Sequence, residues 1–261
     1  MKALLIDTVR CTGCRGCQVA CKEWNKRPAE KTEFFGGPGY QNPKDLSKDT
    51  WCLVTYNEVK INGRFEWVFG KKQCMHCLEP GCASACPVGA LKKTEDGPVV
   101  YRPGICIGCR YCMLACPFLV PRFEFDSPNP YITKCRMCDD RLAMGEIPAC
   151  AKVCPTGAIV FGERDDMIRE AQQRIASNPS VYLHKIYGLE EAGGTCVLHI
   201  SSVPFEELGY ITDIPKQALA TRVEPAMKAI PAVMLGAAIV LGVSYKFRNR
   251  TRQGEEPAAR E

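Results

Sequence analysis

Cysteine is the residue type in this sequence with the clearest capacity for chemistry, and most of its cysteines stand in close groups. The chain has 18 cysteines in 261 residues, and only Cys52 and Cys196 lie outside four groups. Cysteines two residues apart rarely form a disulfide with each other, because the bond needs suitably spaced and directed Cα atoms. The grouping therefore predicts metal binding. The groups, in chain order, are Cys11, Cys14, Cys17 and Cys21; Cys74, Cys77, Cys82 and Cys86; Cys106, Cys109, Cys112 and Cys116; and Cys135, Cys138, Cys150 and Cys154.

The spacing within the groups is typical of bacterial ferredoxins, whose run is C-x2-C-x2-C-x3-C-P. In that run three close thiolates bind one 4Fe–4S cluster, and the fourth binds the neighbouring cluster. Groups one and three have this spacing, and the middle gap widens in groups two and four. A proline follows every group except the first, where Lys22 follows Cys21. Small residues such as Gly13 and Gly108 would let the backbone approach a cluster. Sixteen cysteines in this pattern predict four 4Fe–4S clusters.

Structural zinc is the main alternative for paired cysteines, and the pattern does not favour it. Zinc sites usually combine two C-x2-C pairs separated by about 12–20 residues, without the third close cysteine and the proline. Disulfide scaffolds of this cysteine density are usually secreted chains shorter than about 100 residues. Cys52 and Cys196 stand in β-rich segments, and we expect both to be buried free thiols.

Composition and charge exclude several other classes of protein. Hydrophobic residues make up 46% of the chain and charged residues 24%, which suits a folded core. The formal charge of +5 is spread along the chain, so no basic stripe indicates a nucleic-acid partner. The sequence has no P-loop, no Rossmann glycine pattern and no HExxH motif, and His76, His184 and His199 are isolated from one another. We therefore expect no catalytic residues, and for His76 a packing or surface role near a cluster.

Short strands and one surface helix are expected around the cysteine groups. Two β-rich runs on either side of Asn62-Gly63 predict a hairpin with a type I′ turn. Residues 164–177 place four apolar side chains on one helical face, with two aspartates near the start. Further strands are expected at Ala3–Ile6 and Thr195–Ile200. This mixture indicates an α+β fold.

The sequence repeats itself between cysteine groups. The segment CPVGAL at 86–91 returns as CPTGAI at 154–159. Likewise GCRGCQVAC at 13–21 returns as GCRYCMLAC at 108–116. Such self-similarity predicts duplicated small modules in place of one continuous sheet.

Residues 229–245 form a run of 17 residues without a charge. As a helix, the run would span about 26 Å, slightly less than the ~30 Å hydrocarbon core of a bilayer. Lys228 and Lys246 flank the run and could extend their amines to the two interfaces. A buried core helix is the alternative, but the run lacks a polar face and a basic cluster follows it. We expect a membrane span with the basic cluster on the cytoplasmic side and the cysteine-rich domain on the outer face, although no export signal is visible at the amino terminus.

The expected fold class is α+β, with duplicated bacterial-ferredoxin-like modules, loop insertions and one C-terminal transmembrane helix. The expected parts are a four-cluster domain at 1–163, with a hairpin insertion at about 51–70 and an inner module at about 70–120; an extension with an amphipathic helix at 164–224; a transmembrane helix at 225–247; and a charged tail at 248–261.

Longer stretches of the sequence resemble one protein family. These stretches are CTGCRGCQVACKEWN (11–25), QNPKDLSKDTW (41–51), FEWVFGKKQCMHCLEPGCASACP (65–87) and PACAKVCPTGAIVFG (148–162). They resemble the iron–sulfur (beta) subunit of membrane-bound formate dehydrogenases, within the broader family of four-cluster electron-transfer subunits of molybdopterin oxidoreductases. The segment IYGLEEAGGTCVLHISSVPFEELGY (186–210) also resembles the related subunit of HybA-type uptake hydrogenases.

The resemblance implies how the sixteen cysteines are shared, whereas the sequence alone would equally permit sequential pairing of the groups. It implies that group one pairs with group four, and group two with group three. The implied ligand sets are Cys11, Cys14, Cys17 and Cys154 (set 1); Cys74, Cys77, Cys82 and Cys116 (set 2); Cys106, Cys109, Cys112 and Cys86 (set 3); and Cys135, Cys138, Cys150 and Cys21 (set 4).

The resemblance further implies a non-catalytic relay. Electrons would pass through four 4Fe–4S clusters between a catalytic molybdopterin (or nickel–iron) large subunit and a membrane cytochrome b or quinone-reactive subunit. The first pair of clusters would face the catalytic subunit and the second pair the membrane. The chain would cross the cytoplasmic (inner) membrane once, in contact with the lipid bilayer and without a nucleic-acid partner. A quinone-linked uptake hydrogenase or another molybdopterin oxidoreductase is the alternative complex.

Overall fold

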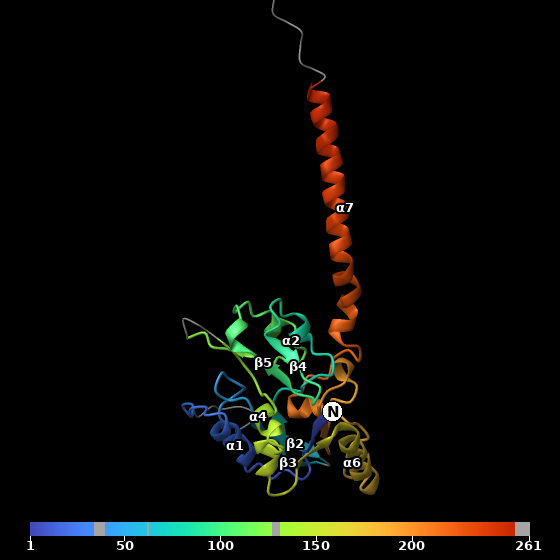
Figure 1. Ribbon diagram of the computed structural model, residues 1–261. Helices are drawn as coiled ribbons and strands as arrows, with labels where there is room; N and C mark the ends of the chain where they lie inside the picture. Colours follow the sequence, from blue (N-terminus) through green and yellow to red (C-terminus); the bar gives the residue numbers. More distant parts are fainter. Residues whose placement is uncertain (34–39, 62, 127–130, 254–261) are drawn as a thin grey trace, which may run out of the picture. The chain divides into compact units, whose positions relative to one another are not determined.

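The computed structural model describes residues 1–33, 40–61, 63–126 and 131–253 (Figure 1). The chain divides into two compact units, Met1–Ala220 and Thr221–Glu261. The first unit contains all 18 cysteines, and all of them are free. Its elements are β1 (Lys2–Asp7), α1 (Gly16–Trp24), β2 (Leu53–Ile61), β3 (Arg64–Lys72), α2 (Gly81–Ser84), β4 (Leu91–Lys93), β5 (Val99–Tyr101), α3 (Tyr111–Leu114), β6 (Arg122–Phe123), β7 (Ile132–Thr133), α4 (Asp139–Ala143), α5 (Ala149–Lys152), β8 (Ile159–Glu163), α6 (Arg164–Ser177) and β9 (Val197–Ile200), with 3₁₀ turns at Pro103–Ile105, Glu191–Gly193 and Phe205–Leu208.

A three-stranded sheet in the order β8-β1-β9 forms the centre of the first unit. Strand β1 pairs antiparallel with β8 and parallel with β9, so the first and last strands of the unit are neighbours. The continuous apolar run of β1 suits a strand that is buried on both faces. Leu5 packs with α6 on one face, whereas Leu4 and Ile6 pack on the other face among residues that include Cys17 and Cys150. One face of the sheet therefore packs against cysteines of groups one and four.

The segment after residue 163 completes this sheet. Helix α6 directly follows β8, and β9 returns to pair with β1. Of the residues expected as a C-terminal extension, 164–220 thus share one compact unit with the cysteine groups. The domain boundary expected between residues 163 and 164 stays a prediction.

Strands β2 and β3 form a long antiparallel hairpin, with Leu53 opposite Lys72 and Ile61 opposite Arg64. Asn62, expected in its turn, lies outside the described residues. Leu53 is buried at the base, whereas Phe65 is three-quarters exposed near the tip. The second cysteine group begins directly after β3.

Four short helices carry cysteines and pack in two pairs. Helix α1 contacts α5, and α2 contacts α3. Helices of one turn are unstable alone, so these depend on their surroundings. Figure 1 shows α2 beside the small β4–β5 sheet. The pairs bring group one beside group four, and group two beside group three.

Helix α7 (Leu219–Gln253) makes up most of the second unit. Its segment Ala229–Asn249 is a candidate membrane span of 21 residues with a mean hydropathy of 1.7, and none of it is buried within the structure. At 1.5 Å per residue this segment is about 31 Å long, which matches the hydrocarbon core of a bilayer. The helix continues to Gln253, beyond the expected end at residue 247. The side chain of Lys228 and residues 254–261 of the expected tail lie outside the described part of the chain.

Candidate metal centres

The cysteines of set 1 line a single cavity although they come from opposite ends of the cysteine-rich region. Cys11 and Cys14 stand in the loop after β1, and Cys17 lies in the first turn of α1. Cys154 follows α5 and joins them because α1 and α5 are in contact. The structure thus brings together four sulfur donors around one space.

Set 3 forms a second cavity of the same kind. Cys106, Cys109 and Cys112 line it from the loop before α3 and from α3 itself. Cys86, which follows α2, supplies the fourth sulfur. Groups two and three therefore exchange a cysteine in the same way as groups one and four.

The other eight cysteines, of which all but Cys21 are buried, also gather in fours. The sulfurs of Cys74, Cys82 and Cys116 surround Cys77 closely enough to raise the pKa of its thiol further, after burial itself, which is the main cause. This gathering corresponds to set 2. In set 4, Cys135 is likewise surrounded by Cys21, Cys138 and Cys150, with Cys74 of set 2 beside them.

Burial controls the ionisation of most of these thiols. Loss of hydration raises the pKa of Cys82 to about 12, and those of Cys112 and Cys138 to about 11. Cys86 is the exception, because the backbone N–H groups of residues 88–91 outweigh its burial and lower its pKa. A metal that binds the buried thiols must displace their protons, so metal binding supplies the free energy that ionises them.

One feature of the backbone conformation recurs at the same place in every group. The residue just before the second cysteine has a positive φ in all four groups: 67° at Gly13, 50° at His76, 68° at Gly108 and 57° at Met137. The backbone N–H of Gly108 donates to Cys106 Sγ at 3.5 Å, and that of Met137 donates to Cys135 Sγ at 3.3 Å. These donors stabilise thiolates and are a known means of tuning iron–sulfur clusters.

The donor sets fit clusters better than single ions. Within the described residues, no three His, Cys, Asp or Glu side chains converge closely enough to hold one metal ion. A zinc ion would need four ligands within about 2.0–2.3 Å. Four sulfurs around a cavity instead suit a core of several iron and sulfide atoms, with thiolate as its normal ligand.

Residues outside the sets have structural roles. His76 is fully buried, its Nδ1 accepts the N–H of Val99 at 2.9 Å, and burial with nearby Lys134 holds its pKa well below the usual value. Of the two expected roles, it therefore has the packing one. Cys52 and Cys196 are buried and free, as predicted.

Two buried lysines, Lys71 and Lys134, were not predicted from the sequence; they are 4% and 3% exposed. Each lies within three residues of the first cysteine of a group, but that position alone does not signal burial.

Known protein families match the cysteine-rich region. Residues 65–164 match a 4Fe–4S dicluster domain, and residues 10–90 match a second 4Fe–4S dicluster domain. All sixteen grouped cysteines fall within the two matches, which supports iron–sulfur clusters as their ligand.

Relatives of the whole chain decide the family. The formate dehydrogenase iron–sulfur subunit of Haemophilus influenzae is 39% identical over 249 residues, which cover 93% of this chain and 79% of that protein. The chain belongs to this family of iron–sulfur subunits. The iron–sulfur subunit of the nitrate-inducible formate dehydrogenase of Escherichia coli K12 is 43% identical over 201 residues, 76% of this chain and 67% of that protein. The family extends to the hydrogenase-2 operon protein HybA of E. coli O157:H7, which is 34% identical over 287 aligned positions, 95% of this chain and 84% of that protein.

Proposed function

We propose that this protein is the electron-transfer subunit of a membrane-bound formate dehydrogenase and carries four 4Fe–4S clusters. It would relay electrons between a catalytic molybdopterin subunit and a membrane cytochrome b or quinone site, and would itself catalyse no bond chemistry. The names of its relatives and the two dicluster matches support the complex and the cofactor. Bound clusters would supply one-electron transfer.

We assign the ligands as sets 1 to 4. The contacts of α1 with α5 and of α2 with α3 support this exchange between groups over sequential pairing. The two cavities, each lined by one complete set, support it directly. We also infer that a ferredoxin-like module is duplicated. Each of the two helix pairs combines three cysteines of one group with a fourth cysteine from a group far away in the sequence.

One observation carries the relay: Cys74 and Cys116 of set 2 share a buried core with Cys135 of set 4. This contact joins the two pairs of sets, so the order along the protein becomes set 1, set 4, set 2, set 3. Cys14 and Cys109, in the two end sets, are exposed, whereas most sulfurs of the middle sets are buried. The chain thereby shields the middle of the path from water and leaves both ends open to partners.

Helix α7 supports a position in the cytoplasmic (inner) membrane with a single span. The basic residues at 246–252 favour the cytoplasm for that end, which leaves the cysteine-rich unit on the outer face. Digestion of the cysteine-rich unit by protease added to spheroplasts would contradict an inside location, whereas digestion only in inverted vesicles would contradict the outer face.

A quinone-linked uptake hydrogenase is the second candidate, because the HybA relative aligns with 95% of this chain. The purified complex should reduce a quinone analogue with formate and not with hydrogen. Hydrogen-dependent reduction alone would assign the chain to the second candidate. Metal analysis of anaerobically prepared protein should give about sixteen irons and as many labile sulfides per chain. Zinc in their place would overturn both assignments.

A further inference from the structure

Lys71 is a buried lysine at the end of β3. Its side chain is 4% exposed, and its ammonium donates to Oε1 of Gln73. No carboxylate forms an ion pair with Lys71 among the residues that the structure describes. Buried charges in proteins are normally paired with an opposite charge or bound to a metal. Lys71 therefore needs an anionic partner, and the candidates are the thiolates of bound clusters and the nearby thiol of Cys52.

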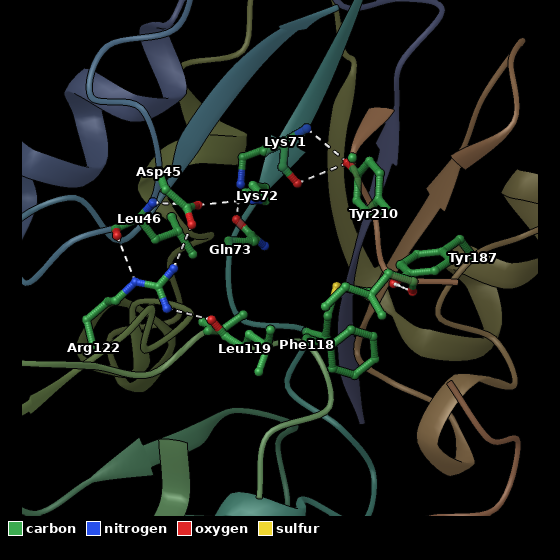
Figure 2. Close-up of a pocket in the computed structure, with 14 residues that line it drawn as sticks. Asp45, Leu46, Lys71, Lys72, Gln73, Phe118, Leu119, Arg122, Tyr187 and Tyr210 are labelled. Carbon is green, nitrogen blue, oxygen red and sulfur yellow. Dashed lines mark hydrogen bonds and ion pairs between the residues drawn. The ribbon is translucent and has the colours of Figure 1, made fainter. Parts of the chain in front are cut away.

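The backbone of Lys71 is fixed from both sides by one tyrosine (Figure 2). Its N–H donates to the hydroxyl of Tyr210 at 2.9 Å, and that hydroxyl donates to its carbonyl oxygen at 3.1 Å. The hydroxyl also lies 3.1 Å from Nδ1 of the buried His199. These contacts fix the backbone at the end of β3, and they therefore limit the positions that the ammonium of Lys71 can take.

The sulfurs around Lys71 are that of Cys52, which belongs to no set, and those of cysteines in sets 1 and 4. Lys71 lines the cavity of set 1, and it also lines a separate cavity of about 220 Å³ drawn in Figure 2. Its ammonium interacts first with Cys52 and then with Cys150 of set 4, Cys17 of set 1 and Cys135 of set 4. Thiolates at these positions would favour the cationic form of the buried amine.

Two other lysines provide matched comparisons. Lys72, the next residue, points to the surface and forms an ion pair with Asp45 at 3.0 Å. Lys134 is buried like Lys71, but it interacts with Cys82 and Cys116 of set 2 and donates to the carbonyl of Val99. The two buried lysines thus serve different parts of the path.

We propose that Lys71 is the fixed counter-charge of the clusters held by sets 1 and 4, and that it raises their reduction potentials. The proposal rests on the four-cluster function above. Reduction adds negative charge to a cluster, so a cation held inside the protein stabilises the reduced form more than the oxidised form. Lys71 is a positioning and tuning residue, because it acts through the cluster ligands.

The test is an EPR-monitored redox titration of the complex purified anaerobically from membranes, with iron and labile sulfide measured in each sample. The variants are Lys71→Met, Lys71→Arg, Lys72→Met and Lys134→Met. In Lys71→Met, two of the four clusters should have lower midpoint potentials. At the wild-type midpoint, their ratio of reduced to oxidised form should fall at least about tenfold, which equals about 59 mV for a one-electron couple. Lys72→Met should shift none, Lys134→Met should shift a different cluster, and Lys71→Arg should resemble the wild type.

Unchanged potentials in a fully loaded Lys71→Met complex would overturn the proposal, as would an equal shift in Lys72→Met. If Lys71→Met lost its iron, the iron content of Lys71→Arg would test the proposal. A full iron content in the arginine variant would support a role for the positive charge. Loss of iron in both variants would refute that role. A wild-type complex with far fewer than about sixteen irons would instead refute the four-cluster function.

Discussion

Arg174 of α6 donates through Nη1 to Oδ2 of Asp7 at 2.9 Å, inside the protein. The carboxylate of Asp7 is fully buried, and the hydroxyl of Tyr182 donates to the same oxygen at 2.9 Å. Its other oxygen accepts the N–H of Val9 at 3.0 Å, at the start of the loop that leads to Cys11. Asp7 therefore ties α6 to the loop that carries the first cysteines of set 1.

Replacement of Arg174 by methionine should lower the stability of the cysteine-rich unit by about 3 kcal/mol, because it leaves a buried carboxylate without its main partner. Anaerobic urea unfolding, followed by the loss of visible absorbance from the clusters, would measure this. Arg169→Met is the matched control, since Arg169 pairs with Asp166 on the exposed side of the same helix. Equal midpoints for the two variants would show that Asp7 does not need Arg174.

Cys154→Ser should remove the ligand that α5 contributes to set 1. Iron should fall from about sixteen to about twelve per chain if the whole cluster is lost. Cys52→Ser is the control, because Cys52 is buried beside the sets and assigned to none of them. Iron analysis with EPR checks both variants. A larger loss in Cys52→Ser than in Cys154→Ser would contradict the assignment of set 1.

Gly13→Ala should disrupt the loop of set 1. A Cβ at this position would stand 2.7 Å from the ring of Phe69, on a backbone whose φ is +67°. Gly209→Ala separates the two effects, because Gly209 has a φ of +70° but nothing within 4 Å of its Cβ position. We expect cluster loss in the first variant and a full iron content in the second. Comparable iron in both would mean that Phe69 moves aside.

Thiol reactivity should follow the local pKa in the cluster-free chain. The pKa of Cys112 is raised to about 11, chiefly by burial, whereas that of Cys86 is lowered by backbone N–H donors. At pH 8 about 0.1% of the Cys112 thiol is ionised, so iodoacetamide should label Cys86 at least about 100-fold faster. The ratio should shrink as the pH rises toward 11, because Cys112 then ionises. Mass spectrometry would follow both sites, and equal labelling at pH 8 would indicate that the chain without clusters is unfolded.

Local features of the sequence predicted local features of the structure. Two β-rich runs on either side of Asn62-Gly63 predicted the hairpin that β2 and β3 form. Strand β1 and helix α6 follow from an apolar run and from helical periodicity, because these patterns are local and indicate which face of an element is apolar. The exact extent of α7 did not follow, since a helix continues through charged residues when nothing stops it.

The type of metal centre was determined by the sequence, because cysteine spacing within a group acts over a few residues of backbone. Which cysteines of different groups lie together was decided by tertiary structure: Cys154 lines one cavity with Cys11 because α1 packs on α5. The same holds for Lys71, whose sequence reads as another surface lysine beside Lys72. Burial depends on what the rest of the chain places around a residue, and in this protein that is the hairpin base, Tyr210 and two sets of sulfurs.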